Sequence, residues 1–289
     1  MVSKPDAGNK RTMQNADPDK AGEAYWSAFW QNNPLPAPVS LDQKSAGNYT
    51  FRKLDSIFKE VFHKNGIKGG ELLEVGCGNS VFLSYFAKEF GFRIAGLDYS
   101  VLGCEQTKKI LKRDGLEGDI IHGDIFQPPT ALINRFDVVC SFGVVEHFDD
   151  TSEVLKRISS LLKPGGLLIT TIPNLTGVTG WMQKTMNRPV YDIHKVMNLE
   201  DLEKANRSAG LTPVHGQYFI PVSFGVTLLP RGDQPVPRLK LKKWILKSFQ
   251  VVGNTISKID DIGLSFPVTP LLSAGIVVAA LKPSDRITE

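Results

Sequence analysis

The sequence predicts an α/β protein built around a parallel sheet with helices on both faces. Three observations support this prediction: an apolar strand runs into a glycine turn at residues 71–80, an acidic residue ends the next apolar segment, and strand-like and helix-like segments alternate from residue 49 to residue 172. Repeated strand–helix units build parallel sheets, and such sheets bind ligands at the carboxyl ends of their strands.

The glycine turn is the first of these observations. Residues 71–80 read Glu-Leu-Leu-Glu-Val-Gly-Cys-Gly-Asn-Ser, in which the apolar residues form a buried strand. Gly76 and Gly78 permit a tight turn and a close approach of the backbone to a ligand, and Asn79 or Ser80 can cap the following helix. The turn indicates a nucleotide-type ligand, although a purely steric use of glycine remains open.

Asp98 helps to distinguish between the possible nucleotide ligands. It ends the second apolar segment, 20 residues after Gly78, where a carboxylate can accept both hydroxyls of an adenosine ribose. A dinucleotide-binding turn would need a third glycine at position 81, where this chain has Val81. The dinucleotide interpretation is therefore weakened.

The remaining elements follow from hydrophobic periodicity and from glycine and proline breaks. A capping box is expected at Asn198 with Asp201. Strands are expected at 71–75, 92–97, 118–122, 135–141, 166–172, 211–220 and 274–281, and helices at 19–32, 49–64, 79–90, 100–114, 151–162, from 198 onward and at 240–259.

Five ordered motifs give the chain a family resemblance. They are Glu74-Val75-Gly76-Cys77-Gly78, Gly96-Leu97-Asp98-Tyr99-Ser100, His122-Gly123-Asp124-Ile125-Phe126, Phe136 to Ser141 followed by Val144-Val145-Glu146-His147, and Leu161-Leu162-Lys163-Pro164-Gly165-Gly166. Over residues 50–282 the chain resembles the class I S-adenosylmethionine-dependent methyltransferases, with one departure at Ser80, where many members carry glycine. The resemblance implies a Rossmann-like, doubly wound seven-stranded sheet, mostly parallel with an antiparallel last strand.

The resemblance also implies S-adenosylmethionine as cofactor and a set of residues that bind it. Asp98 is expected on the ribose, Asp124 with Ile125 around the adenine, and Glu74 near the amino-acid moiety. The full expected cofactor-binding set is Glu74, Gly76, Cys77, Gly78, Asp98, Tyr99, Asp124, Ile125, Ser141 and Phe142.

Candidate catalytic residues are His147, His194 and Glu146. A general base is needed only when the acceptor loses a proton during transfer, as a hydroxyl or an unactivated carbon does. By resemblance, His147 follows the strand end that faces the methyl donor, and His194 lies where some quinone-type O-methyltransferases place a functional histidine; a structural role for either residue stays open. No metal site is expected, because the three cysteines lack zinc-ligand spacing.

The N-terminal residues 1–48 form an extension in front of a methyltransferase domain at 49–289. Tyr25, Trp26 and Trp30 lie at helical spacing, and they either pack on the core or form a lid that lines the acceptor pocket. The expected substrate-binding residues are Tyr25, Trp26, Trp30, His147 and Asn174, and an insertion at 219–272 is expected to carry specificity.

Within this insertion, residues 240–259 have the pattern of an amphipathic helix. Leu241, Ile245, Phe249, Val252, Ile256 and Ile259 form one stripe, and Lys240, Lys243, Lys247, Gln250, Asn254 and Lys258 form another. Six basic residues and no acidic residue lie between Arg238 and Lys258. Three interpretations remain: an ordinary helix packed on the domain, a peripheral membrane or lipid contact through 238–258, and a platform for an anionic substrate.

Composition limits the function further. A net charge of +4, from 34 basic and 30 acidic residues, does not favour nucleic acid as a partner. We expect reduced thiols, a cytoplasmic protein that is peripheral at the membrane if the basic helix binds lipid, and no membrane-spanning segment; the sequence does not indicate the oligomeric state.

The predicted function is S-adenosylmethionine-dependent O-, C- or N-methylation of a small molecule. A lipophilic, quinone-like or isoprenoid acceptor is favoured by the insertion at 219–272. The alternative is a non-catalytic sensor or scaffold that binds S-adenosylmethionine.

Overall fold

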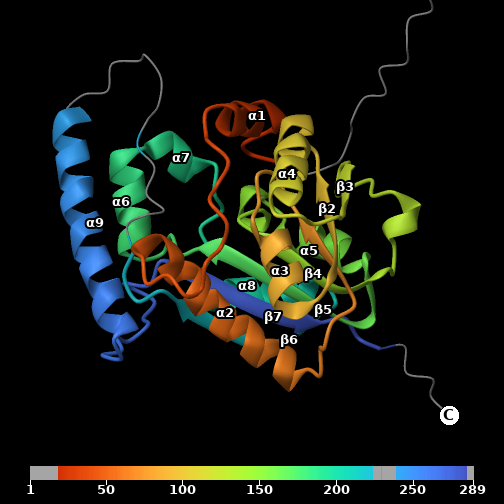
Figure 1. Ribbon diagram of the computed structural model, residues 1–289. Helices are drawn as coiled ribbons and strands as arrows, with labels where there is room; N and C mark the ends of the chain where they lie inside the picture. The colour runs from red at the N-terminus through yellow and green to blue at the C-terminus, as the bar shows by residue number, and fades with distance from the viewer. Residues whose placement is uncertain (1–18, 224–228, 230–238, 285–289) are drawn as a thin grey trace, which may run out of the picture.

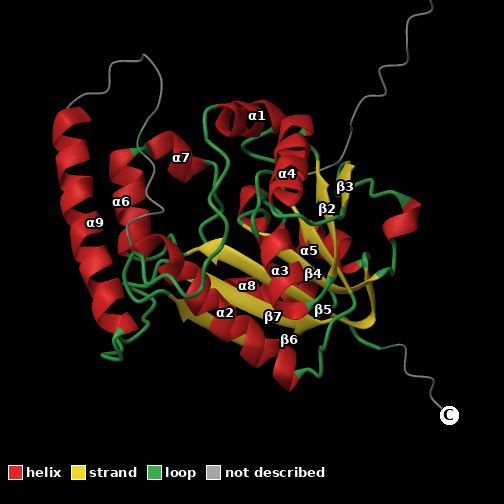
Figure 2. Cartoon of the chain, in the orientation of Figure 1, coloured by secondary structure: helices red, strands yellow, loops and turns green. Residues whose placement is uncertain are grey.

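A seven-stranded sheet forms the centre of the protein, as Figure 2 shows in yellow. The computed structural model describes residues 19–223, 229 and 239–284. The strands are β1 (Glu71–Val75), β2 (Arg93–Asp98), β3 (Asp119–His122), β4 (Phe136–Phe142), β5 (Leu162–Pro173), β6 (Thr212–Phe219) and β7 (Gly275–Leu281). Their order is β3-β2-β1-β4-β5-β7-β6, and β7 pairs antiparallel with both neighbours. The predicted fold class is confirmed.

Helices cover both faces of this sheet (Figure 1). They are α1 (Glu23–Gln31), α2 (Ala46–Lys64), α3 (Phe82–Phe90), α4 (Val101–Arg113), α5 (Thr151–Ser159), α6 (Val178–Met186), α7 (Arg188–Asp192), α8 (Leu199–Ser208) and α9 (Leu239–Asp261), with 3-10 turns η1 (Thr130–Leu132) and η2 (Val145–His147). The capping box of Asn198 and Asp201 is present at the start of α8, as predicted.

The core divides into two hydrophobic layers because successive strand residues point to opposite faces. Leu72 and Val138 pack with α2 and α3, whereas their neighbours Leu73 and Val139 pack with α5 and α8. The strands β1, β4 and β5 are therefore apolar on both faces, as expected for the buried middle of a parallel sheet.

The glycine turn after β1 shifts the start of α3 to a later residue than predicted. Asn79 adopts a left-handed conformation with φ 55°, and α3 begins at Phe82 instead of residue 79. Ser80 still satisfies one free amide, because its Oγ accepts the Phe82 N–H at 3.0 Å. The extra loop residues leave the turn open toward the carboxyl ends of the strands.

The strand β5 starts earlier than predicted, at Leu162 instead of residue 166. Phe136 pairs with Leu162, but Val138 pairs with Leu167, so the segment 163–166 bulges out of the register. Gly165 has φ +77°, which a glycine adopts at little cost. The turn motif predicted to precede the strand therefore lies inside it as a bulge.

Two short helices, α6 and α7, were not predicted and lie at one end of the sheet. Gly177 and Gly180 stand directly before and within α6, and both lie against backbone, that of Pro270 and Leu271 in the first case and of Leu175 in the second. The helix α9 runs beside α6 (Figure 1), and Leu246 packs on Met182.

The helix α9 turns an unexpected face toward the protein. Its buried residues are Leu246, Gly253, Ser257 and Asp260, whereas the predicted apolar stripe leaves Leu241, Phe249 and Val252 exposed. Among the described helices, none is long and apolar enough to span a bilayer. The predicted membrane contact at 238–258 begins at Arg238, which lies outside the described residues.

We predict that Gly76→Ala costs about 2–4 kcal/mol of folding free energy. Gly76 has φ +75°, and a Cβ there would overlap the Val144 side chain. Gly115→Ala is the matched control, because Gly115 has φ +69° but nothing within 4 Å of its Cβ position, so it should lose only about 1 kcal/mol. Urea denaturation measures both, and equal losses would show that the contact with Val144 is unimportant.

Candidate active site

Asp98 closes the glycine turn against the next strand. Its Oδ2 accepts the Gly78 N–H at 2.7 Å, and its Oδ1 accepts the Ser100 N–H at 2.7 Å. Burial raises the pKa of Asp98, while these two amides oppose the rise. The carboxylate is therefore fixed at the carboxyl ends of β1 and β2, where parallel sheets bind nucleotides.

Three buried polar atoms around this turn have no hydrogen-bond partner among the described residues. They are Glu74 Oε2, Asn79 Oδ1 and Ser141 Oγ. Burial raises the pKa of Glu74 to about 8. Unpaired buried polar groups are costly and uncommon, so this crevice is suited to a ligand that supplies hydrogen-bond donors.

The helix α1 lies across the glycine turn, above α4 in Figure 1. The indole Nε1 of Trp30 is 2.8 Å from the position that a Cβ of Gly78 would take. Gln106 Nε2 donates to the Trp30 carbonyl at 2.9 Å, and the hydroxyls of Ser27 and Ser100 are 3.2 Å apart. Trp30 therefore covers the turn directly.

Asp19 ties this N-terminal segment to the body of the protein. Its carboxylate accepts hydrogen bonds from the Tyr99 hydroxyl and, at 3.2 Å, from Trp26 Nε1. The Lys20 N–H donates to the His147 carbonyl at 2.9 Å. The aromatic helix is thus anchored at both the glycine turn and the end of β4.

A cavity of about 750 Å³ lies next to the covered turn, at the carboxyl ends of β4 and β5. Its walls come from α1, α2, α6, α9 and the strand ends, with lining residues that include Tyr25, Trp26, Phe29, Tyr49, Glu146, His147, Thr171, Ile172, Leu175, Gln183, His194, Phe219 and Ile220. Of the expected substrate-binding residues, Tyr25, Trp26 and His147 line the cavity, and Trp30 and Asn174 do not.

Asn174 has a different environment from the one predicted. It is fully buried, and its Nδ2 donates to the carbonyls of Pro270 at 2.7 Å and Ser273 at 2.8 Å. These bonds fasten the end of β5 to the segment before β7. The amide therefore holds the cavity floor together rather than facing the cavity.

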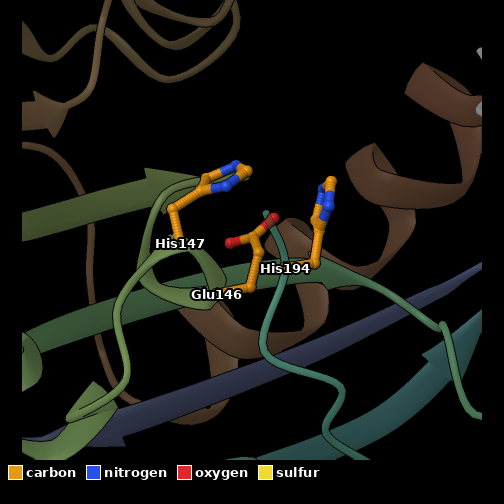
Figure 3. Close-up of side chains that lie close together, drawn as sticks. All are labelled: Glu146, His147 and His194. Carbon is orange, nitrogen blue, oxygen red and sulfur yellow. The ribbon is translucent and has the colours of Figure 1, made fainter. Parts of the chain in front are cut away.

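Glu146, His147 and His194 meet at the cavity (Figure 3). The first two belong to η2, and the third follows α7. The Lys195 N–H donates to the Glu146 carbonyl at 2.6 Å, which brings the two distant segments together. The ring centroids of His147 and His194 are 4.6 Å apart.

Both imidazoles are held in one tautomer by backbone carbonyls. His147 Nδ1 lies 3.0 Å from the Ile193 carbonyl, and His194 Nδ1 lies 2.6 Å from the Val190 carbonyl. A carbonyl oxygen only accepts, so each Nδ1 carries a hydrogen and each Nε2 of the neutral ring keeps its lone pair. Burial lowers the pKa of both rings, that of His194 to about 4.

Glu146 completes this cluster. Its side chain is buried, its Oε2 has no hydrogen-bond partner in the described chain, and burial raises its pKa to about 8. One ligand atom from each of the three residues lies within 4.8 Å of the others. Two imidazole lone pairs in this arrangement can accept a proton, and together with Glu146 in its ionised form they can hold a divalent cation.

Four further residues of the expected cofactor set are positioned by local contacts. Asp124 Oδ1 accepts the Phe126 N–H at 2.9 Å, and Ile125 beside it is buried. The Cys77 side chain lies against Gly96 of β2. The Phe142 ring packs on the Phe82 ring, with 4.2 Å between the ring centroids.

The sequence did not single out the polar groups that α6 and α9 bring to the cavity. Gln183 of α6 and Gln250, Asn254 and Ser257 of α9 line it. The last three are spaced by four and three residues, so they lie on one helix face. Gln250 and Asn254 were assigned to the polar stripe, but only the folded chain shows that these two residues of the stripe line a cavity.

The comparisons with known proteins agree with this geometry. A family model described as "Methyltransferase domain" matches residues 47–216. The chain belongs to this family and is a class I S-adenosylmethionine-dependent methyltransferase. S-adenosylmethionine is its cofactor.

The similar curated proteins include quinone-pathway enzymes. The chain is 30% identical over 220 residues to a ubiquinone biosynthesis O-methyltransferase of Cereibacter sphaeroides, covering 72% of this chain and 88% of that protein. It is 27% identical to the protein of the same name from Dinoroseobacter shibae, covering 69% and 82%.

Among solved structures, the fold is similar to that of geranyl diphosphate C-methyltransferase from Streptomyces coelicolor A3(2), with a TM-score of 0.56, 14% identity, and coverage of 93% of this chain and all of that chain. It is also similar to phosphoethanolamine N-methyltransferase 2 from Haemonchus contortus, with a TM-score of 0.53, 16% identity, and coverage of 93% and 59%. At these identities the similarity supports the fold alone.

We predict that acidification destabilises the wild type more than His194→Asn. An unfolded histidine binds a proton below pH 6.5, whereas folded His194 does so only near pH 4. The unfolded state therefore binds more protons in this window, and stability falls as the pH falls, by about 1 kcal/mol per pH unit. Urea midpoints at pH 7 and pH 5 measure the difference.

Glu146 has the opposite slope, since its raised pKa gives stability that is lost as the pH rises toward 8. Both proteins contain Glu146, so its contribution cancels when the pH dependence of stability of the wild type is compared with that of His194→Asn. Long-range ¹H–¹⁵N spectra provide an independent check, because both rings should show the Nδ1–H tautomer. Equal pH slopes in the two proteins would contradict the burial of His194 as a neutral ring.

Proposed function

We propose that this protein methylates a hydroxyl oxygen of a lipophilic small molecule held in the 750 Å³ cavity. One observation carries the proposal: Glu146, His147 and His194 converge on the cavity with two unprotonated Nε2 atoms and an unpaired carboxylate oxygen. Such a cluster can take a proton from an acceptor, or lower the pKa of that acceptor, at the point where the methyl group arrives.

The proposed cofactor site is the crevice between the glycine turn and α1. Glu74 Oε2, which lacks a partner, can accept from the ammonium group of the methionine moiety. We assign the ribose to Asp98, the adenine surroundings to Asp124 and Ile125, and the backbone approach to Gly76 and Gly78. The bound cofactor supplies an electrophilic methyl group, and the protein positions the acceptor against it and excludes water.

Trp30 has to adapt when the cofactor binds. Its indole lies against Gly78, which we assign to the backbone approach to the cofactor. The helix α1 has no fully buried residue, so contacts such as that of Gln106 can break and re-form without exposing a hydrophobic core. We therefore assign α1 the role of a lid that moves from the turn and closes again over the cofactor.

An oxygen acceptor fits this site better than a nitrogen acceptor. An amine can attack through its own lone pair, so it needs no group to ionise it, whereas a hydroxyl becomes an effective nucleophile when it loses its proton. The cluster of Glu146, His147 and His194 can accept the proton of such a hydroxyl. The relatives from Cereibacter and Dinoroseobacter are named O-methyltransferases, which supports the same class.

A lipophilic acceptor fits the rest of the cavity. Tyr25, Trp26 and Phe29 form one wall, and Ile172, Leu175, Phe219 and Ile220 extend the apolar lining away from the cluster. Aromatic rings can pack on a flat ring, and the aliphatic portion can hold a hydrocarbon tail. The polar cluster then selects the end of the molecule that carries the hydroxyl.

A divalent cation is a second candidate for the way in which the cluster activates the acceptor. Two imidazole nitrogens and a carboxylate suit first-row metals such as iron, cobalt, manganese or zinc. Both histidines donate Nδ1–H to backbone carbonyls, the arrangement that orients metal-ligating imidazoles. When bound, a cation supplies Lewis acidity that lowers the pKa of a hydroxyl.

The proposed activity is tested by transfer of a labelled methyl group to prenylated phenols, with amine and carbon acceptors in parallel. We expect His147→Ala and His194→Ala to lower kcat about 10²- to 10⁴-fold, while S-adenosylmethionine binding by calorimetry is retained. His63→Ala on α2 is the matched control, because His63 is exposed and far from the cavity, and it should keep full activity.

Asp98→Ala separates binding from transfer, since it should abolish S-adenosylmethionine binding. Methylation of amines with no methylation of phenols would overturn the hydroxyl assignment. Phenol methylation at the wild-type rate by both histidine variants would show that the cluster takes no part in methyl transfer.

The cation is tested on protein stripped with a chelator. We expect one Co²⁺ ion per chain to bind with visible absorption bands that change when imidazole ligands are removed, and Glu146→Gln and His194→Asn each to weaken binding about 10- to 100-fold. His63→Asn should bind as the wild type does. Failure of Co²⁺ and Zn²⁺ to bind the wild type would leave proton acceptance as the role of the cluster.

A further inference from the structure

The outer face of α9 carries an exposed apolar surface that no described residue covers. We propose that α9 and the segment 262–272 form a docking surface for an anionic lipid membrane, and we call this the α9 surface. Its apolar residues are Leu241, Trp244, Val251, Val252, Ile262, Leu264, Val268, Leu271 and Leu272. This inference rests on the proposed lipophilic acceptor and adds the place from which that acceptor comes.

The packing of α9 is the first argument. The residues that α9 buries are Leu246, Gly253, Ser257 and Asp260, which are mostly small or polar. Ile245, Ile256 and Ile259 are half-buried, but Leu241, Trp244, Val251 and Val252 are exposed, Trp244 to 68%. With 3.6 residues per turn, these four residues fall on the side away from the buried residues. The described chain thus leaves this part of the helix surface uncovered.

The exposed surface continues past the end of α9. Ile262 and Leu264 are 71% and 66% exposed, and the segment returns to the sheet through Asn174, which holds Pro270 and Ser273. Single exposed apolar residues are ordinary, but a contiguous patch marks an interaction surface. The α9 surface is therefore built by two consecutive segments, α9 and the residues that follow it.

The charge beside this patch identifies its occupant. Lys240, Lys243, Lys247 and Lys258 are exposed along one flank of α9, and residues 239–259 contain no acidic residue. Asp260 and Asp261, which follow, are neutralised by Lys53 and Arg52 of α2. An apolar face flanked by lysines is the pattern of helices that lie in the headgroup region of anionic membranes.

The inner face of the same helix connects the surface to the cavity. Gln250, Gly253, Asn254 and Ser257 of α9 line the cavity, while Trp244, Val251 and Val252 face outward. The helix therefore separates the acceptor site from the proposed membrane by its own thickness. α9 also lies beyond the 47–216 range of the family match.

Vesicle sedimentation of the full chain tests the proposal. We expect binding to phosphatidylglycerol-containing vesicles at low salt, weak binding to pure phosphatidylcholine vesicles, and release as salt is raised. Lys240→Gln, Lys243→Gln and Lys247→Gln together should weaken binding to anionic vesicles about 100-fold. The matched control is Lys108→Gln, Lys109→Gln and Lys112→Gln on the exposed side of α4, which should bind normally.

The apolar part is tested with Trp244→Ser, Val251→Ser and Val252→Ser, which should lose binding and the blue shift of Trp244 fluorescence on vesicles. Absence of wild-type binding to anionic vesicles, or equal binding by the lysine variants and the wild type, would overturn the proposal. If light scattering shows that the wild type is a dimer and the serine variants are monomers, the α9 surface would instead bind a second copy of the chain.

The proposed function can fail separately. A short-chain, water-soluble phenol needs no vesicle, so both α9 variants should methylate it at the wild-type rate. If they do, and vesicle binding is absent, only the membrane inference fails. If no phenol is methylated while vesicles still bind, the proposed function fails and the membrane surface stands.

Discussion

The turn after β1 depends on two positions that cannot carry a side chain. A Cβ at Gly76 would overlap Val144, and one at Gly78 would lie 2.8 Å from the Trp30 indole and 3.0 Å from Asp98 Oδ2. The backbone of these two glycines therefore lies against three separate elements: the end of β4, the helix α1 and the end of β2. Close packing at this junction holds the backbone of the turn in place.

The proposed acceptor site is costly for stability and is held in place by its surroundings. Glu146 is buried with an unpaired oxygen, and burial drives both neighbouring histidines toward their neutral forms. A fold optimised only for stability would fill this space with apolar side chains. The backbone carbonyls of Val190 and Ile193 and the Lys195 amide hold the cluster in place instead, which is the support that preorganised chemistry requires.

The strands were predictable to within one or two residues at most ends because apolar runs and glycine turns are local signals. The helices α6 and α7 were not, since their packing depends on Gly177 and Gly180 fitting against backbone, including that of residues 270–271 from far along the chain. His147 and His194 were each predicted as candidates, but their meeting depends on the backbone contact between Glu146 and Lys195. A single sequence does not report such a contact, so the cluster became visible only in the fold.

The helix α9 shows why the same amphipathic pattern supports different interpretations. Periodicity identifies an apolar stripe, and the usual inference is that this stripe faces the core. Here the small and polar residues Gly253, Ser257 and Asp260 face inward because they border a cavity and a charged anchor formed by Tyr49 and Lys53. Because the side of α9 toward the protein is shared with a cavity, only part of its apolar surface packs on the core, as Leu246 does on Met182. The exposed remainder is available to a partner from outside, and the neighbouring lysines favour a lipid surface over a neutral partner.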